Sequence, residues 1–220
     1  MWNEKRYQWF YDHLHSHYYD LLMRWCFLPF GGEEKFRKGL IAHINFSPGD
    51  KILDMCCGTG SVTFIAAQMA GVKSEVIGMD LSSGQLGIAR KRNHLSNVRF
   101  LEGNVTATGF ESGYFNKVFI THALHEMRRE IRLKVLAEAR RVLREGGEVI
   151  ILELDNPENL LVRLLIGFWF FYWLPFNFET PTRKDMFKQG LTKEVEEVGF
   201  KHIIRLPKYR GVFQVIHGIN

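Results

Sequence analysis

The chain has 220 residues, of which 46% are hydrophobic and 24% charged, so it is long and apolar enough for one folded α/β domain with a small cap. Its formal net charge is +5, but the basic residues are scattered, which disfavours nucleic acid as a partner. Three cysteines cannot form a disulfide framework, and no His/Cys spacing resembles a zinc site, so no metal is expected.

The N-terminus lacks the apolar core of a signal peptide. The longest apolar run, residues 164–174, is shorter than the ~20 residues that a membrane-spanning helix needs. A cytoplasmic location is therefore expected.

Aromatic and aliphatic residues at helical spacing predict an N-terminal helical arm over residues 1–46, with helices at 4–27 and 33–45. Beyond a Ser-Pro-Gly-Asp turn, apolar runs and amphipathic segments alternate. Strands are expected at 51–55, 75–80, 98–102, 116–121 and 147–153, and helices at 61–70, 83–95 and 130–144. This alternation predicts βαβ units and a parallel sheet.

The C-terminal part departs from this pattern. Residues 157–190 form an apolar, aromatic insertion that predicts a cap. Strands are then expected at 201–206 and 211–217, and because they are so close in the chain they must form a hairpin. The whole chain is thus predicted to be a single domain, 1–220, with a core at 48–153, the cap insertion at 157–190 and a terminal hairpin at 200–217.

The segment 52–60 reads Ile-Leu-Asp-Met-Cys-Cys-Gly-Thr-Gly and is the most informative part of the sequence. An apolar strand leads into a turn with Gly58 and Gly60, where glycines let the backbone turn tightly and a ligand approach closely. Asp80 ends the next strand, where a carboxylate accepts hydrogen bonds from a ribose diol. Asp54 lies just before the turn, a position that suits a cationic ligand.

Phosphate-bearing cofactors fit this turn less well. A dinucleotide fingerprint requires a third glycine at position 63, where this chain has Thr63, and a P-loop requires Gly-Lys-Ser/Thr after the turn. S-adenosylmethionine (SAM) carries an adenosine, a cationic sulfonium and a methionine part but no phosphate, and fits better. A plain strand-to-helix turn without a ligand is the alternative from this segment alone.

Four segments resemble, in order, the motifs of the class I SAM-dependent methyltransferases: 52–60, 78–82 (Gly-Met-Asp-Leu-Ser), 100–105 (Phe-Leu-Glu-Gly-Asn-Val) and 142–147 (Val-Leu-Arg-Glu-Gly-Gly). The resemblance covers the predicted core, and the terminal hairpin suits the same fold. It implies an α/β fold with a Rossmann-like, seven-stranded, mostly parallel sheet whose last strand is antiparallel. It also implies that SAM is the cofactor and methyl transfer the activity.

The same resemblance assigns cofactor contacts. It implies that Asp54, Gly58 and Gly60 surround the methionine part of SAM and that Asp80 holds the ribose. Asn104 would lie beside the adenine amino group, where the family usually has an aspartate; an amide carbonyl accepts the hydrogen bond without charge assistance. Neighbouring positions of these motifs complete the predicted cofactor-binding set: Cys57, Thr59, Leu81, Val105 and Thr121.

Methyl transfer is an in-line displacement, so the protein aligns the reactants, and a base is needed only when the nucleophile carries a proton. The loop after the fourth strand contains His122 and His125, both candidate bases near neutral pH. His125 is preferred because Glu126 follows it as a carboxylate partner, whereas His122 is alternatively backbone-bonded or beside the adenine. Tyr19 is a third candidate, because an N-terminal helix folds over this site in related enzymes; core packing is the alternative.

Residues 160–174 are apolar all round except for Arg163. A helix of this kind is buried in a cap, lines an apolar pocket or lies at a membrane interface. The pocket and the interface both favour a hydrophobic small molecule or lipid-like compound as methyl acceptor. Flanking basic residues suit an anionic bilayer surface, so peripheral membrane contact is a further expectation.

The chain is most similar to the branch that contains quinone-ring C-methyltransferases and small-molecule methyltransferases. Its Tyr-Asp pairs at 11–12 and 19–20 resemble the start of the quinone enzymes. Its loop at 123–126 reads Ala-Leu-His-Glu, where those enzymes usually have Gly-x-Arg-Asn. A quinone-ring C-methyltransferase is therefore one alternative to a broader hydrophobic acceptor, and a non-catalytic SAM-binding protein is another.

Overall fold

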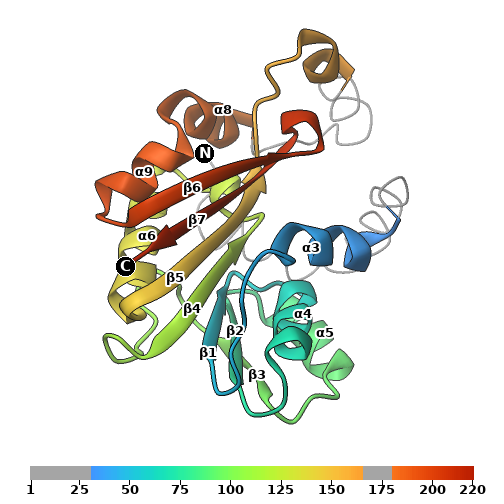
Figure 1. Ribbon diagram of the computed structural model, residues 1–220, viewed down its shortest axis with the longest axis vertical. Helices are drawn as coiled ribbons and strands as arrows, with labels where there is room; N and C mark the ends of the chain where they lie inside the picture. The colour runs from blue at the N-terminus through green and yellow to red at the C-terminus, as the bar shows by residue number, and fades with distance from the viewer. Residues whose placement is uncertain (1–30, 166–179) are drawn as a thin grey trace. The chain divides into compact units, whose positions relative to one another are not determined.

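The computed structural model describes residues 31–165 and 180–220. Its strands form a seven-stranded sheet in the order β3-β2-β1-β4-β5-β7-β6 (Figure 1). The last strand, β7, pairs antiparallel with both β5 and β6. The predicted Rossmann-like α/β fold with an antiparallel last strand is thereby confirmed. The chain divides into two compact units, Met1–Gly109 and Phe110–Asn220.

The first unit carries three parallel strands and three described helices. Strand β2 pairs with β1 on one side and with β3 on the other, and α4 packs against all three strands. In chain order the elements are α3 (Glu33–Ile41), β1 (Lys51–Met55), α4 (Ser61–Ala70), β2 (Glu75–Asp80), α5 (Ser83–Arg92) and β3 (Val98–Glu102). The predicted bounds of all three strands and of α4 are confirmed.

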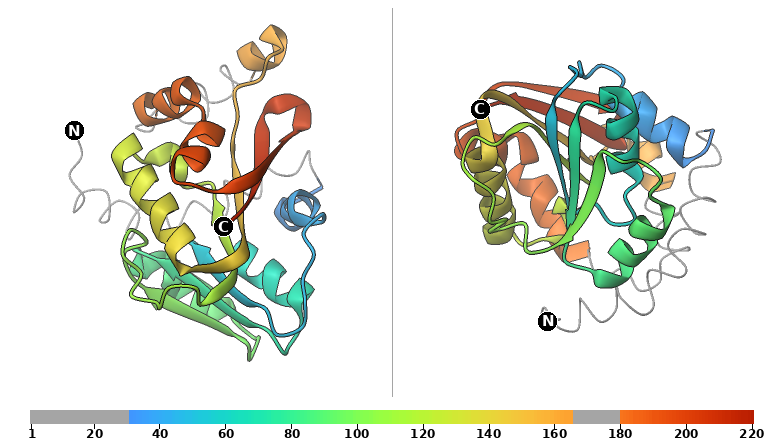
Figure 2. Two further views of the ribbon diagram at one scale, coloured as in Figure 1. Left: turned by 60° about the vertical axis from the view of Figure 1, so that its left-hand side comes forward. Right: turned by 90° about the horizontal axis from the view of Figure 1, so that it is seen from below.

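The second unit carries four strands, with β4 parallel to β5. Helices α6, α8 and α9 lie together on one side of these strands (Figure 2). In chain order the elements are β4 (Phe115–Thr121), η3 (Leu124–Glu126), α6 (Arg129–Val142), β5 (Leu143–Leu154), α8 (Thr180–Gln189), α9 (Leu191–Glu197), β6 (Lys201–Lys208), η4 (Tyr209–Gly211) and β7 (Phe213–Ile219). Residues 160–165 are also helical.

Several predicted boundaries were wrong by a few residues. The helix expected at 83–95 ends at Arg92, because Asn93 accepts a hydrogen bond from Leu95 N and donates one to Val98 O, which turns the chain back towards β3. Strand β5 begins at Leu143 rather than at 147, with a register shift opposite Phe115 to Lys117. Strand β7 begins two residues later than expected, because the turn η4 extends to Gly211.

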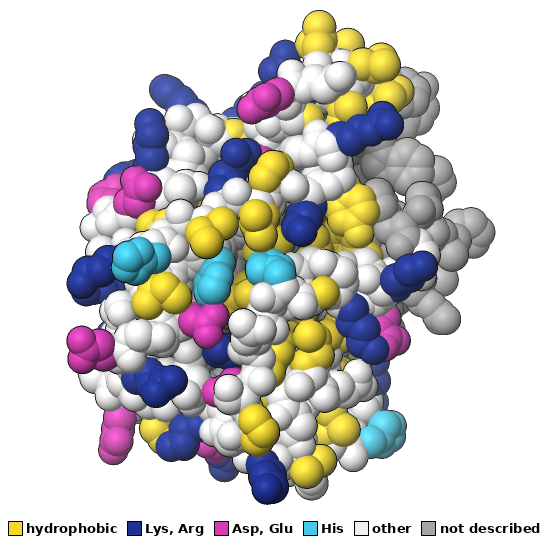
Figure 3. Space-filling model, viewed as in Figure 1, with side chains coloured by type: hydrophobic (Ala, Val, Ile, Leu, Met, Phe, Trp, Pro, Cys, Tyr) yellow, Lys and Arg dark blue, Asp and Glu magenta, His cyan; other side chains and the backbone are white. Residues whose placement is uncertain are grey.

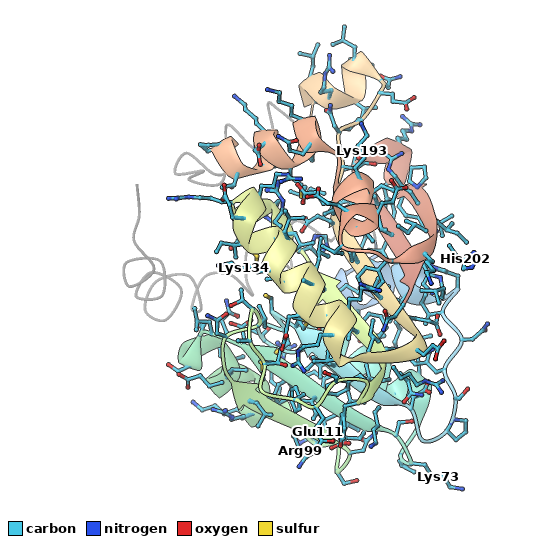
Figure 4. The ribbon with its side chains drawn as sticks, turned by 90° about the vertical axis from the view of Figure 1, so that its left-hand side faces the viewer. Lys73, Arg99, Glu111, Lys134, Lys193 and His202 are labelled. Carbon is cyan, nitrogen blue, oxygen red and sulfur yellow. The ribbon has the colours of Figure 1, made fainter. Side chains whose placement is uncertain are left out.

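A buried ion-pair network holds the helices of the second unit together. Arg132 on α6 is fully buried and donates to both carboxylate oxygens of Glu194 on α9, at 2.7 and 2.6 Å. It also donates to Asp185 on α8 and to the carbonyl of Met127, at 2.9 and 2.8 Å. Figure 4 views α6 and α9 from their outer side, with Lys134 and Lys193 labelled. Because Met127 directly follows η3, Arg132 also anchors the loop that ends there.

Candidate active site

The glycine turn after β1 is held by the end of β2. The N–H of Cys57 donates to Met79 O at 3.1 Å, and the N–H of Gly58 donates to Asp80 Oδ2 at 2.8 Å. Cys56 has a φ of 59°, in the left-handed region that costs a side-chain-bearing residue energy. The loop that carries Asn104 joins the same place, because Gly103 N donates to Asp80 O at 2.9 Å. Three predicted cofactor segments therefore meet at the carboxyl ends of these strands, where ligands bind in open α/β sheets.

The Asp80 carboxylate accepts hydrogen bonds from two segments at this corner. In addition to Gly58 N, its carboxylate accepts from Ser82 N at 2.9 Å, so each oxygen takes one backbone donor. A carboxylate has about four lone-pair sites, so each of its oxygens can accept more than one hydrogen bond. The predicted ribose contact is compatible with this geometry and stays a prediction.

Asp54 is a buried carboxylate with one oxygen left over. Thr63 Oγ1 donates to its Oδ2 at 2.6 Å, whereas its Oδ1 has no hydrogen-bond partner among the described residues. Desolvation by burial raises the pKa of Asp54 to about 7, although the Thr63 hydrogen bond and the charge of Arg37 act to lower the pKa. Leaving such an acceptor unpaired is costly, so Oδ1 is suited to receive a ligand donor, best of all a cationic one.

The two glycines of the turn have different roles. A Cβ on Gly60 would lie 2.7 Å from Cζ of Phe100, and one on Gly78 would lie 2.8 Å from the same ring. These glycines therefore make room for Phe100, which also packs edge-on against Phe64 at 5.5 Å between ring centroids. A Cβ on Gly58 would meet only Gln85 Oε1, at 3.5 Å. Of the pair, Gly58 is thus the one suited to close approach of a ligand.

Gln85 is a candidate site residue that the sequence analysis missed. It lies in the first turn of α5, where its N–H is capped by Ser82 Oγ at 3.2 Å. Its side chain is buried, and Oε1 has no hydrogen-bond partner among the described residues. A second unpaired acceptor beside Gly58 points to a donor group on a ligand. No sequence signal marked it, because polar residues in the first turn of a helix ordinarily face solvent.

The other predicted cofactor residues of this unit differ in burial and in hydrogen bonding. Asn104 is exposed, and its Oδ1 accepts from the N–H and hydroxyl of Thr106 at 2.9 and 2.8 Å. An adenine contact through this oxygen would require the side chain to turn away from Thr106. Burial raises the pKa of the Cys57 thiol, which keeps it protonated. Thr59 and Val105 are buried and Leu81 is half-buried.

In the second unit, His125 pairs with a carboxylate that sequence reasoning did not anticipate. Its Nδ1 lies 2.7 Å from Oε1 of Glu153, and both side chains are buried. Glu126, the expected partner, is only at 4.0 Å from Nε2, so the expectation that it orients the ring was wrong. A signal for Glu153 did exist: it is the sole charged residue in the otherwise apolar run 149–154.

Glu153 is held in its ionised form. Burial would raise the pKa of Glu153, but the charge and hydrogen bond of His125, the charge of His122 and the Leu154 N–H lower the pKa to about 2. Its Oε2 also accepts from the N–H groups of Leu124 and His125, at 2.9 and 3.3 Å. The carboxylate therefore fixes both the ring and the backbone of η3, and its negative charge lies against Nδ1 of the ring.

His122 lies at the end of β4 in a different setting. Its φ is 50°, and its main-chain N–H donates to Leu152 O at 2.8 Å. Its ring packs edge-on against Phe213 at 5.5 Å between centroids, and Phe213 in turn contacts Tyr209. Thr121, also predicted to bind the cofactor, is buried one position earlier. Tyr19 lies outside the described residues, as do residues 166–176 of the apolar segment.

The mixed sheet with its antiparallel last strand, the glycine turn with the buried Asp54, and the carboxylate that ends β2 are those of the class I SAM-dependent methyltransferase fold. Solved structures share it. The chain superposes on a SAM-dependent methyltransferase of Methanococcus maripaludis with a TM-score of 0.69 and 16% identity, covering 94% of this chain and 92% of that one. A phosphoethanolamine N-methyltransferase of Haemonchus contortus in complex with SAM gives a TM-score of 0.69 at 13% identity, over 97% and 60%.

The model of the ubiE/COQ5 methyltransferase family matches residues 2–187, and the chain belongs to this family. It is 30% identical to an uncharacterized methyltransferase of Synechocystis sp., over 88% of this chain and 86% of the relative. It is 32% identical to a demethylmenaquinone methyltransferase of Lactococcus lactis, over 79% and 68%. The chain is therefore a SAM-dependent methyltransferase, which decides against the non-catalytic alternative.

Proposed function

We propose that this enzyme methylates a lipophilic small molecule by in-line transfer, with His125 as the group that takes up the acceptor's proton. The observation that carries the proposal is the buried contact of 2.7 Å between His125 Nδ1 and Glu153. A buried carboxylate holds the ring in one orientation and stabilises the imidazolium that forms when the neutral ring takes up a proton, as a general base requires. A base of this kind contributes typically ~10²–10⁴-fold to a rate.

The residues around the glycine turn would hold the cofactor. Asp54 Oδ1 and Gln85 Oε1 are buried acceptors without partners among the described residues, so they suit donor groups of the methionine part and the ribose. Asp80 and Asn104 are proposed for the ribose and the adenine. When bound, SAM supplies a methyl carbon that its sulfonium has already activated. Alignment and exclusion of water are then the main tasks of the protein.

A quinone-ring carbon is the second candidate for the methyl acceptor. It is favoured by the relatives named demethylmenaquinone methyltransferases, which are 32–34% identical over 64–79% of this chain. The loop at 123–126 differs from the Gly-x-Arg-Asn expected of quinone enzymes, which favours a broader lipophilic class, including lipid-like compounds. An acceptor of either kind partitions into bilayers, so peripheral contact with a membrane is part of the proposal.

The test is the formation of S-adenosylhomocysteine from SAM with a demethylmenaquinol, with a phenolic lipid and with a total lipid extract. His125→Asn should lower kcat by about 10²–10⁴-fold with nearly unchanged SAM affinity, and the acidic limb of the pH profile should disappear. His122→Asn serves as the matched comparison and should leave that limb in place. Equal kcat values and pH profiles for wild type and His125→Asn would remove the base from the proposal.

A further inference from the structure

The helical segment 160–165 presents its apolar residues to solvent. The segment begins at Asn159, whose side-chain Oδ1 accepts from Val162 N at 3.1 Å and whose carbonyl accepts from Arg163 N at 3.0 Å. Positions i, i+1, i+4 and i+5 lie on one face of a helix. Leucines occupy all four, with exposed fractions of 58%, 66%, 62% and 61% for Leu160, Leu161, Leu164 and Leu165. Of the three alternatives for this segment, burial in a cap does not describe these four leucines.

A basic and aromatic turn lies at the base of this segment. Asp155 N donates to Val212 O at 2.8 Å, and a Cβ on Gly211 would lie 3.4 Å from Cα of Pro157. The turn η4 is thus next to the start of the helical segment. It presents an exposed tyrosine and an exposed arginine, Tyr209 and Arg210, after the half-buried Lys208.

The segment and the turn together form the leucine patch: the four leucines, Arg163, Lys208, Tyr209 and Arg210. Figure 3 shows hydrophobic side chains at the top of the view, over the helical segment 160–165 of Figure 1, with basic side chains and an acidic one beside them. Glu158 is the exposed carboxylate in the chain next to the patch, so three basic residues outnumber it. An apolar face bordered by positive charge and an aromatic hydroxyl complements an anionic lipid surface.

We propose that the leucine patch is the surface by which this protein docks on an anionic bilayer. Two observations favour a lipid surface over a protein partner for this patch. Its apolar residues are leucines of a single helix face with cations at the margin, the arrangement of interfacial helices. In sequence, the apolar run also continues through Leu174 without another charged residue. No helix in the described part of the chain is long and apolar enough to span a membrane.

The docking surface rests on the proposed function in one respect: docking gives the enzyme access to a lipophilic acceptor dissolved in the same bilayer. The test needs no acceptor. Sedimentation of the full chain with vesicles of phosphatidylglycerol and phosphatidylcholine should show binding that weakens as the anionic fraction falls or the salt rises.

Two sets of variants sharpen the experiment. Leu161→Glu/Leu164→Glu should reduce vesicle binding at least tenfold, and Arg163→Gln or Arg210→Gln should reduce it about fivefold each, the factor for one basic residue near such a surface. The matched control is Val72→Glu, because Val72 is 81% exposed but lies in the first unit, and it should bind vesicles as wild type does.

Two binding results would overturn the docking surface: no binding to anionic vesicles, or equal binding of wild type and the double variant. A lower melting temperature of the double variant would also overturn it, because the leucines would then contribute to packing inside the protein. A wild-type dimer that the double variant loses would instead assign the patch to a second copy of the chain, also against the proposal. SAM binding by calorimetry and turnover of a detergent-dispersed acceptor report on the proposed function separately, because both should survive in the double variant.

Discussion

The Nδ1 atom of His125 and Oε1 of Glu153 are 2.7 Å apart, although 28 positions separate the two residues in the chain. His125 is in the turn η3 that follows β4, and Glu153 is near the carboxyl end of β5. Strands β4 and β5 are parallel neighbours, with Thr121 opposite Leu152, so their ends meet at one edge of the sheet. The parallel register therefore builds the pair.

The first prediction concerns Glu153 as a positioning residue. Glu153→Gln keeps the shape of the side chain but removes the negative charge that favours a protonated imidazole. We expect the His125 ring to titrate at a lower pH in NMR spectra, the acidic limb of the activity profile to move to lower pH, and kcat to fall roughly ten- to a hundredfold. SAM affinity should stay nearly constant.

The same strand offers a matched control. Glu148 on β5 also accepts from a histidine, His217 Nε2 at 2.7 Å, and from Lys117. Burial acts to raise the pKa of Glu148, but His217 and Lys117 lower the pKa to about 2. Glu148→Gln should cost stability and leave the pH profile unchanged. If both variants altered the pH profile alike, the loss of any negative charge on β5 would explain the effect, and the His125–Glu153 pair would have no special role.

The second prediction concerns the pH dependence of SAM binding. Because burial raises the pKa of Asp54 to about 7, this carboxyl is largely protonated at pH 6 and ionised at pH 8. A cationic ligand prefers the ionised form, so binding should release a proton and tighten between pH 6 and 8. Calorimetry in buffers of different ionisation enthalpy measures that proton directly. Asp54→Asn should bind more weakly and lose the carboxyl's share of the proton release.

The stability of the ligand-free protein should change in the opposite direction. A carboxyl whose pKa is about 7 when folded and 3.8 when unfolded stabilises the fold fully below pH 3.8, and this stability is lost as pH rises through 7. Asp54→Asn should therefore raise the melting temperature at pH 8 relative to wild type, by about 2–4 °C for each kcal/mol recovered. At pH 4 the two proteins should melt together; a larger gain at pH 4 than at pH 8 would contradict the assignment.

The third prediction separates binding from stability at Gln85. Gln85→Met is close in volume and removes a buried acceptor that has no partner among the described residues. The ligand-free protein should become equally or more stable, whereas SAM affinity should fall by about 1–3 kcal/mol. Gln85→Glu retains an acceptor and should retain more of the affinity. Thermal melts with and without SAM measure both effects in one experiment, and parallel losses in both would indicate simple packing.

The fourth prediction concerns Arg132. Arg132→Met would leave the buried Glu194 carboxylate without its bidentate partner and Met127 O without its donor, so we expect a loss of about 3–5 kcal/mol. Lys38→Met is the control, because Lys38 pairs with Glu34 on an exposed helix face and should cost little. Denaturant unfolding gives both values. A similar small cost for the two would mean that packing, not charge pairing, holds α6 to α9.

The first unit was predictable from sequence because its signals are local. Apolar runs ended by Gly and Asp fix β1 and β2, and the bounds of α4 follow from Gly60 before it and Gly71 after it. Boundaries that depend on tertiary contacts were missed. The early end of α5 is set by the hydrogen bond from Asn93 to Val98 across a turn, which residue spacing does not reveal.

The candidate site was predictable only where a motif carried it. Asp54, Gly58 and Asp80 stand at motif positions, and the structure brings them to one corner. Glu153 was missed because its partner is remote in the chain. Gln85 was missed because a polar residue in the first turn of a helix is ordinarily expected to face solvent. Both are recognised by burial together with hydrogen bonding, which exist only once the chain is folded.

One phenylalanine restricts what two glycines, far apart in the chain, can be exchanged for. The ring of Phe100 occupies the space that a methyl group on either Gly60 or Gly78 would need, so neither position can enlarge while the ring stays. A smaller residue at position 100 removes this contact at both positions, but Gly60 keeps its φ of 80° and Gly78 keeps Cys57 Sγ at 2.9 Å from an added Cβ. Substitutions at positions 78 and 100 should therefore be epistatic: Gly78→Ala should be less damaging alongside Phe100→Leu than by itself, with the cost of the Cys57 contact remaining. Gly60→Ala should stay damaging in either background, because its backbone conformation disfavours a side chain.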